Sequence, residues 1–127
     1  MNLEKVIFGF FIVMALTLNF GFVLGEIDNP AHHSIVELFC AIVVNLIATV
    51  LKLGDRSQIG AVLLATSLVA DLQLLAAAVV WAWTVHVLNT PLDASSTTVI
   101  VSLAGGAVVA NVVSVTMVVA ETLMLRR

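Results

Sequence analysis

The sequence has 127 residues, of which 61% are hydrophobic and only 10% are charged, and its formal net charge is -3. A soluble domain of this length needs a polar surface, which this composition does not supply. The charged residues gather in short stretches between long apolar runs, so lipid is the solvent that suits those runs. The sequence has no basic patch of the kind that binds nucleic acid. Its single cysteine, Cys40, cannot form an intrachain disulfide.

Four apolar runs follow one another along the chain. The first, Val6 to Leu24, would be about 29 Å long as a helix, which matches a hydrocarbon core of roughly 30 Å. The third and fourth runs are longer, so their helices tilt or extend into the headgroup layer. Asn29 and Pro30 predict a turn and a helix start after the first run. We predict one all-α membrane domain over residues 1–127, a four-helix bundle with helices over residues 5–25, 31–53, 58–88 and 96–125.

The cations of the chain predict its orientation. All of them lie at the ends of runs on one alternating side of the predicted bundle: Lys5, Lys52, Arg56, Arg126 and Arg127. Lys and Arg in short loops favour the cytoplasmic side of a membrane. We therefore expect a multi-pass protein with both termini and the middle loop in the cytoplasm, and the loops at residues 25–33 and 89–96 on the other side.

Asp71 lies near the middle of the third run, where a charged side chain costs at least ~2.5–3.5 kcal/mol. Counting from Arg56 and from Arg126 places Asp71 and Asn111 at similar depth, so we expect them to be partners across the two helices. Three further polar residues lie within about one turn of that depth: Asn45, Ser67 and Ser114. This layer either lines a polar site or ion path, or supplies interhelical hydrogen bonds that fix the helix register.

Gln73 follows Asp71 by two residues and so points about 200° away from it. The third helix therefore presents polar groups to two different neighbours. A bundle helix on one side and an oligomer or complex partner on the other would satisfy both.

Small residues are spaced for close helix packing in two runs. Helix four carries Ser102, Gly106 and Ala110 at intervals of four residues, and the first run has a G-x-x-x-G from Gly21 to Gly25. Small residues at this spacing let helix backbones approach each other in lipid. We expect them to pack the bundle or to form a subunit interface.

The sequence contains few signals for chemistry. His32, His33 and Glu37 are weak candidates for a metal site, but their spacing matches no specific ligand motif, and a first-turn acid explains Glu37. No G-x-S-x-G, P-loop or C-x-x-C motif is present. We expect no bound metal, no cofactor and no enzymatic activity.

Several stretches carry a family resemblance. They are EKVIFGFF (residues 4–11), NLIATVLKLGDRSQIGA (45–61), LLATSLVADLQL (63–74) and VVANVVSV (108–115). Over nearly its whole length the chain resembles a family of small, functionally uncharacterised bacterial inner-membrane proteins with four helices. Relatives in that family tend to accompany Trk/Ktr-type potassium uptake systems. The resemblance implies a place in the bacterial inner membrane and an accessory role in cation transport.

Three functions fit these observations. The first is an accessory or structural subunit of a cation (potassium) transport complex, which needs a membrane-protein partner. The second is a cation channel formed by a homo-oligomer, with Asp71 on the ion path. The third is a lipid-organising or assembly protein without transport activity. All three place the chain in a lipid bilayer.

Overall fold

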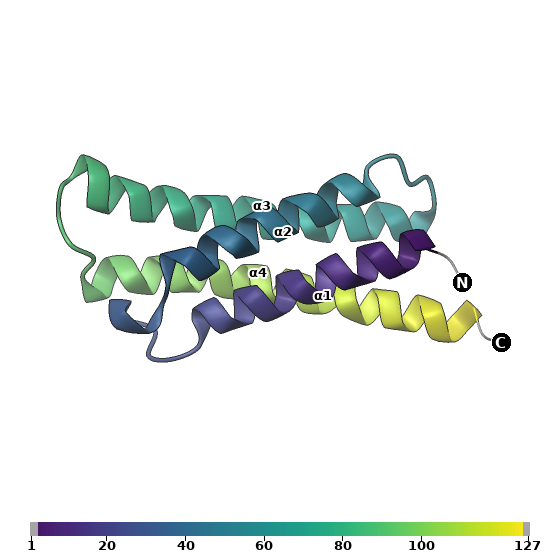
Figure 1. Cartoon of the computed structure of the whole chain (residues 1–127), viewed down its shortest axis with the longest axis horizontal. Coiled ribbons are helices and arrows are strands. Elements are labelled where there is room, and N and C mark those ends of the chain that lie inside the picture. The colour runs from purple at the N-terminus through teal and green to yellow at the C-terminus, as the bar shows by residue number, and fades with distance from the viewer. Residues whose placement is uncertain (1–2, 126–127) are drawn as a thin grey trace.

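A computed structural model describes residues 3–125, which form an all-helical bundle (Figure 1). Four helices run up and down the bundle: α1 (Leu3–Val23), α2 (Ile35–Lys52), α3 (Gln58–Ala82) and α4 (Ala94–Leu125). Each of them is long and apolar enough to cross a membrane, and the span that begins with α3 extends through the following turn to Val87. The predicted all-α fold with four helices is confirmed.

Figure 1 shows which segments of the chain share each end of the bundle. The start of α1 and the end of α4 lie at the same end of the bundle as the α2–α3 loop. By their positions in the sequence, Lys5, Lys52 and Arg56 belong to this end. We call this the lysine end. The α1–α2 and α3–α4 connections lie at the opposite end, which we call the histidine end after His32 and His33. The other two cations of the chain, at positions 126 and 127, lie outside the described residues.

Capping residues place the start of α2 later than the sequence predicted. Asn29 does not cap α2, because its side chain accepts a hydrogen bond from Ala31 N (3.0 Å) and caps a separate 3-10 turn, Pro30–His32. The Ser34 hydroxyl accepts from Val36 N (3.2 Å), so α2 begins at residue 35 rather than 31. The structure therefore has two capping residues, Asn29 and Ser34, where the sequence predicted only Asn29.

At the histidine end, the last residues of α1 and α3 also differ from those predicted. α1 ends at Val23, and Gly25 adopts a φ of 99°, a left-handed conformation that favours glycine. The expected packing role of Gly25 in a G-x-x-x-G face is therefore wrong, because this residue lies beyond the helix. α3 does not continue as a regular helix to residue 88 but closes in a π turn, η2 (Trp83–Val87), in which Leu88 N donates to Trp83 O (2.9 Å).

The interior consists of two apolar clusters with polar side chains at their junction. α1 packs against α2 and α4, and α3 packs against the same two helices. The cluster toward the histidine end is built around Phe22, Leu38, Leu74 and Ile100. The cluster toward the lysine end contains Phe8, Ile12, Ala48 and Leu63. Polar side chains from all four helices are buried at this junction: Asn19, Asn45, Thr49, Ser67, Asp71, Asn111 and Ser114.

Candidate functional site: the mid-bundle polar layer

Side-chain contacts fix the register of α3 against α4. The Thr66 and Ser114 hydroxyls lie 2.5 Å apart, and the amide of Gln73 lies directly against Gly106. In this antiparallel register Asp71 lies opposite residue 109, so Asn111 is within roughly 3 Å of its depth along the helix axis. The depth predicted for these two residues therefore agrees with the observed register. We refer to the buried polar side chains at this depth as the polar layer.

The side chain of Asp71 forms a hydrogen bond with α2 and not with α4. Its Oδ2 lies 2.5 Å from Thr49 Oγ1, and its side chain is buried. The expected Asp71–Asn111 pair is not formed, because Asp71 faces α2 at this level. Sequence reasoning missed Thr49, although its position four residues after Asn45 puts both side chains on one face of α2.

The Thr49 hydroxyl has more acceptors than it can serve. Its Oγ1 lies 2.9 Å from the backbone oxygen of Asn45 as well as 2.5 Å from Asp71 Oδ2. A hydroxyl carries one hydrogen, so it cannot donate to both oxygens at once. A protonated Asp71 would donate to Thr49 and leave the Thr49 hydrogen for Asn45 O. The geometry therefore suits the neutral acid, which also avoids the cost of a charge in lipid.

Several buried oxygens of the polar layer have no hydrogen-bond partner among the described residues. They come from three helices: Asn45 Oδ1 on α2, Ser67 Oγ and Asp71 Oδ1 on α3, and Asn111 Oδ1 on α4. Thr97 Oγ1, nearer the histidine end, is a further case. Carboxylate and amide oxygens accept hydrogen bonds from water and bind hard cations. Ser67 and Ser114, which were expected to support Asp71, do not: Ser114 pairs with Thr66 instead.

Asn19 adds α1 to the polar layer, and sequence reasoning missed it. Its side chain is fully buried against the backbone of α4. In the amide orientation that matches donors to acceptors, Nδ2 donates to Ala104 O (3.2 Å) and Oδ1 accepts from Val108 N (3.1 Å). An asparagine inside an otherwise apolar run was the available signal, because such residues commonly hydrogen-bond across helices.

Gln73 faces outward, into a groove between α3 and α4. The groove has a volume of about 480 Å³ and is lined by Ala65, Thr66, Val69, Gln73, Gly106, Val109 and Ala110. We call it the α3–α4 groove. The Gln73 side chain is half-buried and makes no hydrogen bond within residues 3–125. A Cβ at Gly106 would occupy the space that the Gln73 amide fills, so a larger residue there would displace this flexible side chain.

The small residues predicted to pack helices have different positions in the structure. On α4, Ser102 is exposed, Gly106 lies under Gln73, and Ala110 is buried. This row of small residues on α4 is therefore exposed at Ser102 and packed against α3 at Gly106. On α1, a Cβ at Gly21 would lie 2.6 Å from Glu37 Oε2, so the carboxylate of Glu37 in the first turn of α2 lies over this glycine.

The histidine end does not assemble a metal site from the predicted candidates. His33 Nδ1 lies 2.6 Å from Phe22 O and its Nε2 lies 2.8 Å from Glu26 O, so both ring nitrogens point at backbone carbonyl oxygens. His32 Nδ1 accepts a hydrogen bond from Glu26 N (2.8 Å). Within the described residues, no three His, Cys, Asp or Glu side chains gather as a ligand set. These histidines instead tie the α1–α2 connection to the end of α1.

Comparison with known proteins places the chain in a family. A model described as "Family of unknown function (DUF6394)" matches residues 32–122, which include the whole of α2 and α3 and most of α4. The chain belongs to this family. The matched segment contains Thr49, Asp71, Gln73, Gly106 and Asn111. No curated protein and no solved structure matches the chain.

Proposed function

We propose that this member of the DUF6394 family is an accessory subunit of a membrane complex and binds a transmembrane helix of a partner protein in the α3–α4 groove. The observation that carries the proposal is the Gln73 amide, which lies half-buried in that groove near mid-bundle without a hydrogen bond to the described residues. Lipid tails offer an amide neither donors nor acceptors. A polar side chain from a partner helix would supply them.

The small residues that line the α3–α4 groove suit the close approach of another helix. Small side chains at Ala65, Gly106 and Ala110 make the surface concave beside the Gln73 amide. A single convex helix fills such a groove and brings a side chain within reach of Gln73.

We further propose that the four helices span the bacterial inner membrane with the lysine end in the cytoplasm. Lys5, Lys52 and Arg56 all lie at that end, and short loops rich in Lys and Arg favour the cytoplasmic side. The resemblance to proteins that accompany Trk/Ktr-type systems makes a potassium transport protein the expected partner. The α3–α4 groove would then lie within the membrane, facing that protein.

Purification in mild detergent at native expression level tests the assembly. We expect the purified chain to retain a multi-pass transport protein. Gln73→Leu should lower the recovery of this partner about tenfold, because it removes one interhelical hydrogen bond worth up to ~2 kcal/mol. A matched control exchanges two neighbours, Gln73→Leu with Leu72→Gln, which keeps the composition but moves the amide out of the groove. The exchange should not restore recovery. A parent chain that purifies alone, or a Gln73→Leu variant that retains its partner fully, would contradict the proposal.

A second candidate function is cation binding within the polar layer, and the unpartnered oxygens favour it. Asn45, Asp71 and Asn111 each bury a carboxyl or amide oxygen that has no partner among the described residues. Oxygen ligands of this kind suit hard cations. On this candidate, vesicles containing the purified chain conduct a monovalent cation and Asp71→Asn abolishes the flux. Equal flux in the parent and in Asp71→Asn, or none in either, would rule it out.

A further inference from the structure

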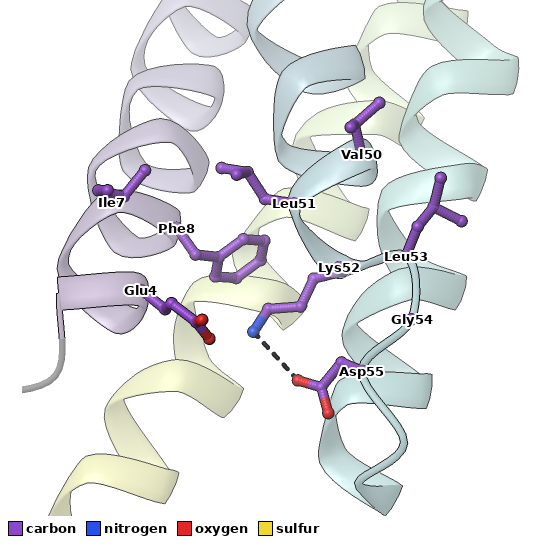
Figure 2. Close-up of a pocket in the computed structure, with 9 residues that line it drawn as sticks. All are labelled: Glu4, Ile7, Phe8, Val50, Leu51, Lys52, Leu53, Gly54 and Asp55. Atoms are coloured by element: carbon purple, nitrogen blue, oxygen red, sulfur yellow. Dashed lines mark hydrogen bonds and ion pairs between the residues drawn. The ribbon is translucent and has the colours of Figure 1, made fainter.

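A pocket of about 560 Å³ lies at the lysine end, between the start of α1 and the end of α2 (Figure 2). α2 ends at Lys52, whose ammonium group reaches the ring of Phe8 in the second turn of α1. The chain then leaves through Gly54, whose φ of 88° turns it away from the helix axis. The space beside the last turn of α2 is therefore bounded by α1 and by the loop. Its volume is in the range of small-molecule sites, roughly 300–1,000 Å³.

One cation and two carboxylates line this pocket. Lys52 Nζ lies 4.3 Å from the centroid of the Phe8 ring and 3.4 Å from Asp55 Oδ2. Figure 2 shows the carboxyl group of Glu4 turned toward the same ammonium group. Hydrogen bonds from the Ser57 hydroxyl and backbone N–H hold the pKa of the Asp55 carboxyl below its ordinary value. Asp55 therefore carries its charge at neutral pH, and the lining has both signs of charge in one place.

An apolar groove continues from the pocket along α2. Val50 and Leu51 line both hollows, and the groove extends over Val43, Leu46 and Ile47 with a volume of about 340 Å³. These five side chains recur at helical spacing on one exposed face of α2, which points away from the bundle interior. A charged pocket at the end of the bundle thus adjoins a shallow apolar groove that runs along α2. A phospholipid has this same order of parts, a charged headgroup followed by an acyl chain.

We propose that the pocket binds the headgroup of an amine-bearing zwitterionic phospholipid of the phosphatidylethanolamine class, with one acyl chain in the α2 groove. The phosphate would pair with Lys52, and the primary ammonium would donate hydrogen bonds to Glu4 and Asp55. Phosphatidylglycerol matches Lys52 but places no cation beside the two carboxylates. A choline headgroup carries a cation without N–H donors. Of these three headgroups, only ethanolamine meets both requirements.

This lipid site is separate from the α3–α4 groove. It is built from α1, α2 and the α2–α3 loop, whereas the groove is lined only by α3 and α4. The two proposals can therefore fail independently. A chain without a protein partner could still bind this lipid, and a chain with a partner could lack it.

Native mass spectrometry of the full chain, released from nanodiscs of equal parts phosphatidylethanolamine, phosphatidylglycerol and phosphatidylcholine, tests the site. We expect phosphatidylethanolamine adducts to dominate and Lys52→Gln to lower them about tenfold, as expected for loss of a charge-assisted hydrogen bond. The matched control is Arg56→Gln, which removes the same charge four residues further along the chain but does not line the pocket. It should leave the adducts unchanged. Free phosphoethanolamine should not displace the lipid, because it lacks the acyl chain.

A second variant keeps the proposal testable if Lys52→Gln weakens the fold. Glu4 is exposed at the start of α1, and Glu4→Gln should shift the bound lipid from phosphatidylethanolamine toward phosphatidylglycerol by removing one partner of the ammonium group. Adducts that follow the bulk lipid composition in the parent and in both variants would overturn the proposal. A preference for phosphatidylglycerol in the parent would do the same.

Discussion

Replacing Thr49 with Val should lower the free energy of unfolding by about 1–3 kcal/mol, the cost of leaving buried polar groups without partners. The Thr49 hydroxyl connects Asp71 Oδ2 on α3 with the backbone oxygen of Asn45 on α2, and Val removes both contacts. Asp71→Asn should change the free energy by less than about 1 kcal/mol, because an amide N–H can donate to Thr49 as a neutral carboxyl does.

Cys40 is the only cysteine of the chain, so unfolding can be followed by its reaction with a thiol reagent during a denaturant titration. Each titration is run in potassium and in a bulky organic cation at equal ionic strength. A neutral Asp71 predicts the same stability in both salts. Stabilisation by potassium that disappears in Asp71→Asn would contradict the neutral acid and favour a cation in the polar layer. A Thr49→Val variant as stable as the parent would contradict the role of Thr49.

Gly106→Leu should displace the Gln73 amide and close the α3–α4 groove, and so lower partner recovery about tenfold, as Gln73→Leu does. Its cost in stability should be smaller than the ~1–3 kcal/mol of a rigidly overpacked core, because the displaced amide is the end of a flexible side chain. The Gln73 amide already fills the space where a side chain at position 106 would lie. The neighbouring glycine supplies a matched control, because a Cβ at Gly105 meets nothing within 4 Å. Gly105→Leu should be neutral or stabilising by up to about 1 kcal/mol, since glycine is a poor helix former.

The same thiol titration measures both glycine variants, and partner recovery is measured beside it. Loss of partner recovery in Gly106→Leu, with none in Gly105→Leu and with both variants folded, is the expected result. Equal partner recovery from the two variants would contradict the docking of a partner helix over position 106.

The four helices could be predicted from sequence because membrane helices are marked by long apolar runs, and Asp71 stood out because a carboxyl group is rare within them. Their ends were less predictable. Ser34 and Asn29 are both good caps, and only the structure shows that Asn29 caps a 3-10 turn. Gly25 fitted a packing motif by spacing alone, but α1 ends two residues before it.

Partners within the polar layer were harder to predict than its depth. Counting residues from the cations placed Asp71 near Asn111, because antiparallel helices share one rise per residue. Counting does not give the direction in which a side chain points, so the bond to Thr49 was missed. Asn19 was missed because its partners are backbone groups of α4, which no side-chain pattern reveals. The outward direction of Gln73 followed from its spacing relative to Asp71, and the groove it lines required the structure.

Site-specific photo-crosslinking in cells tests the proposed docking of a partner helix most directly. A photoreactive residue is placed at Val109 in the α3–α4 groove and, as a control, at Phe39 on the outer face of α2; both side chains are 64% exposed. We predict that Val109 crosslinks to a second, multi-pass membrane protein, that Gln73→Leu removes this product, and that Phe39 does not form it. A product containing two copies of this chain, or the same pattern from both positions, would contradict the proposal.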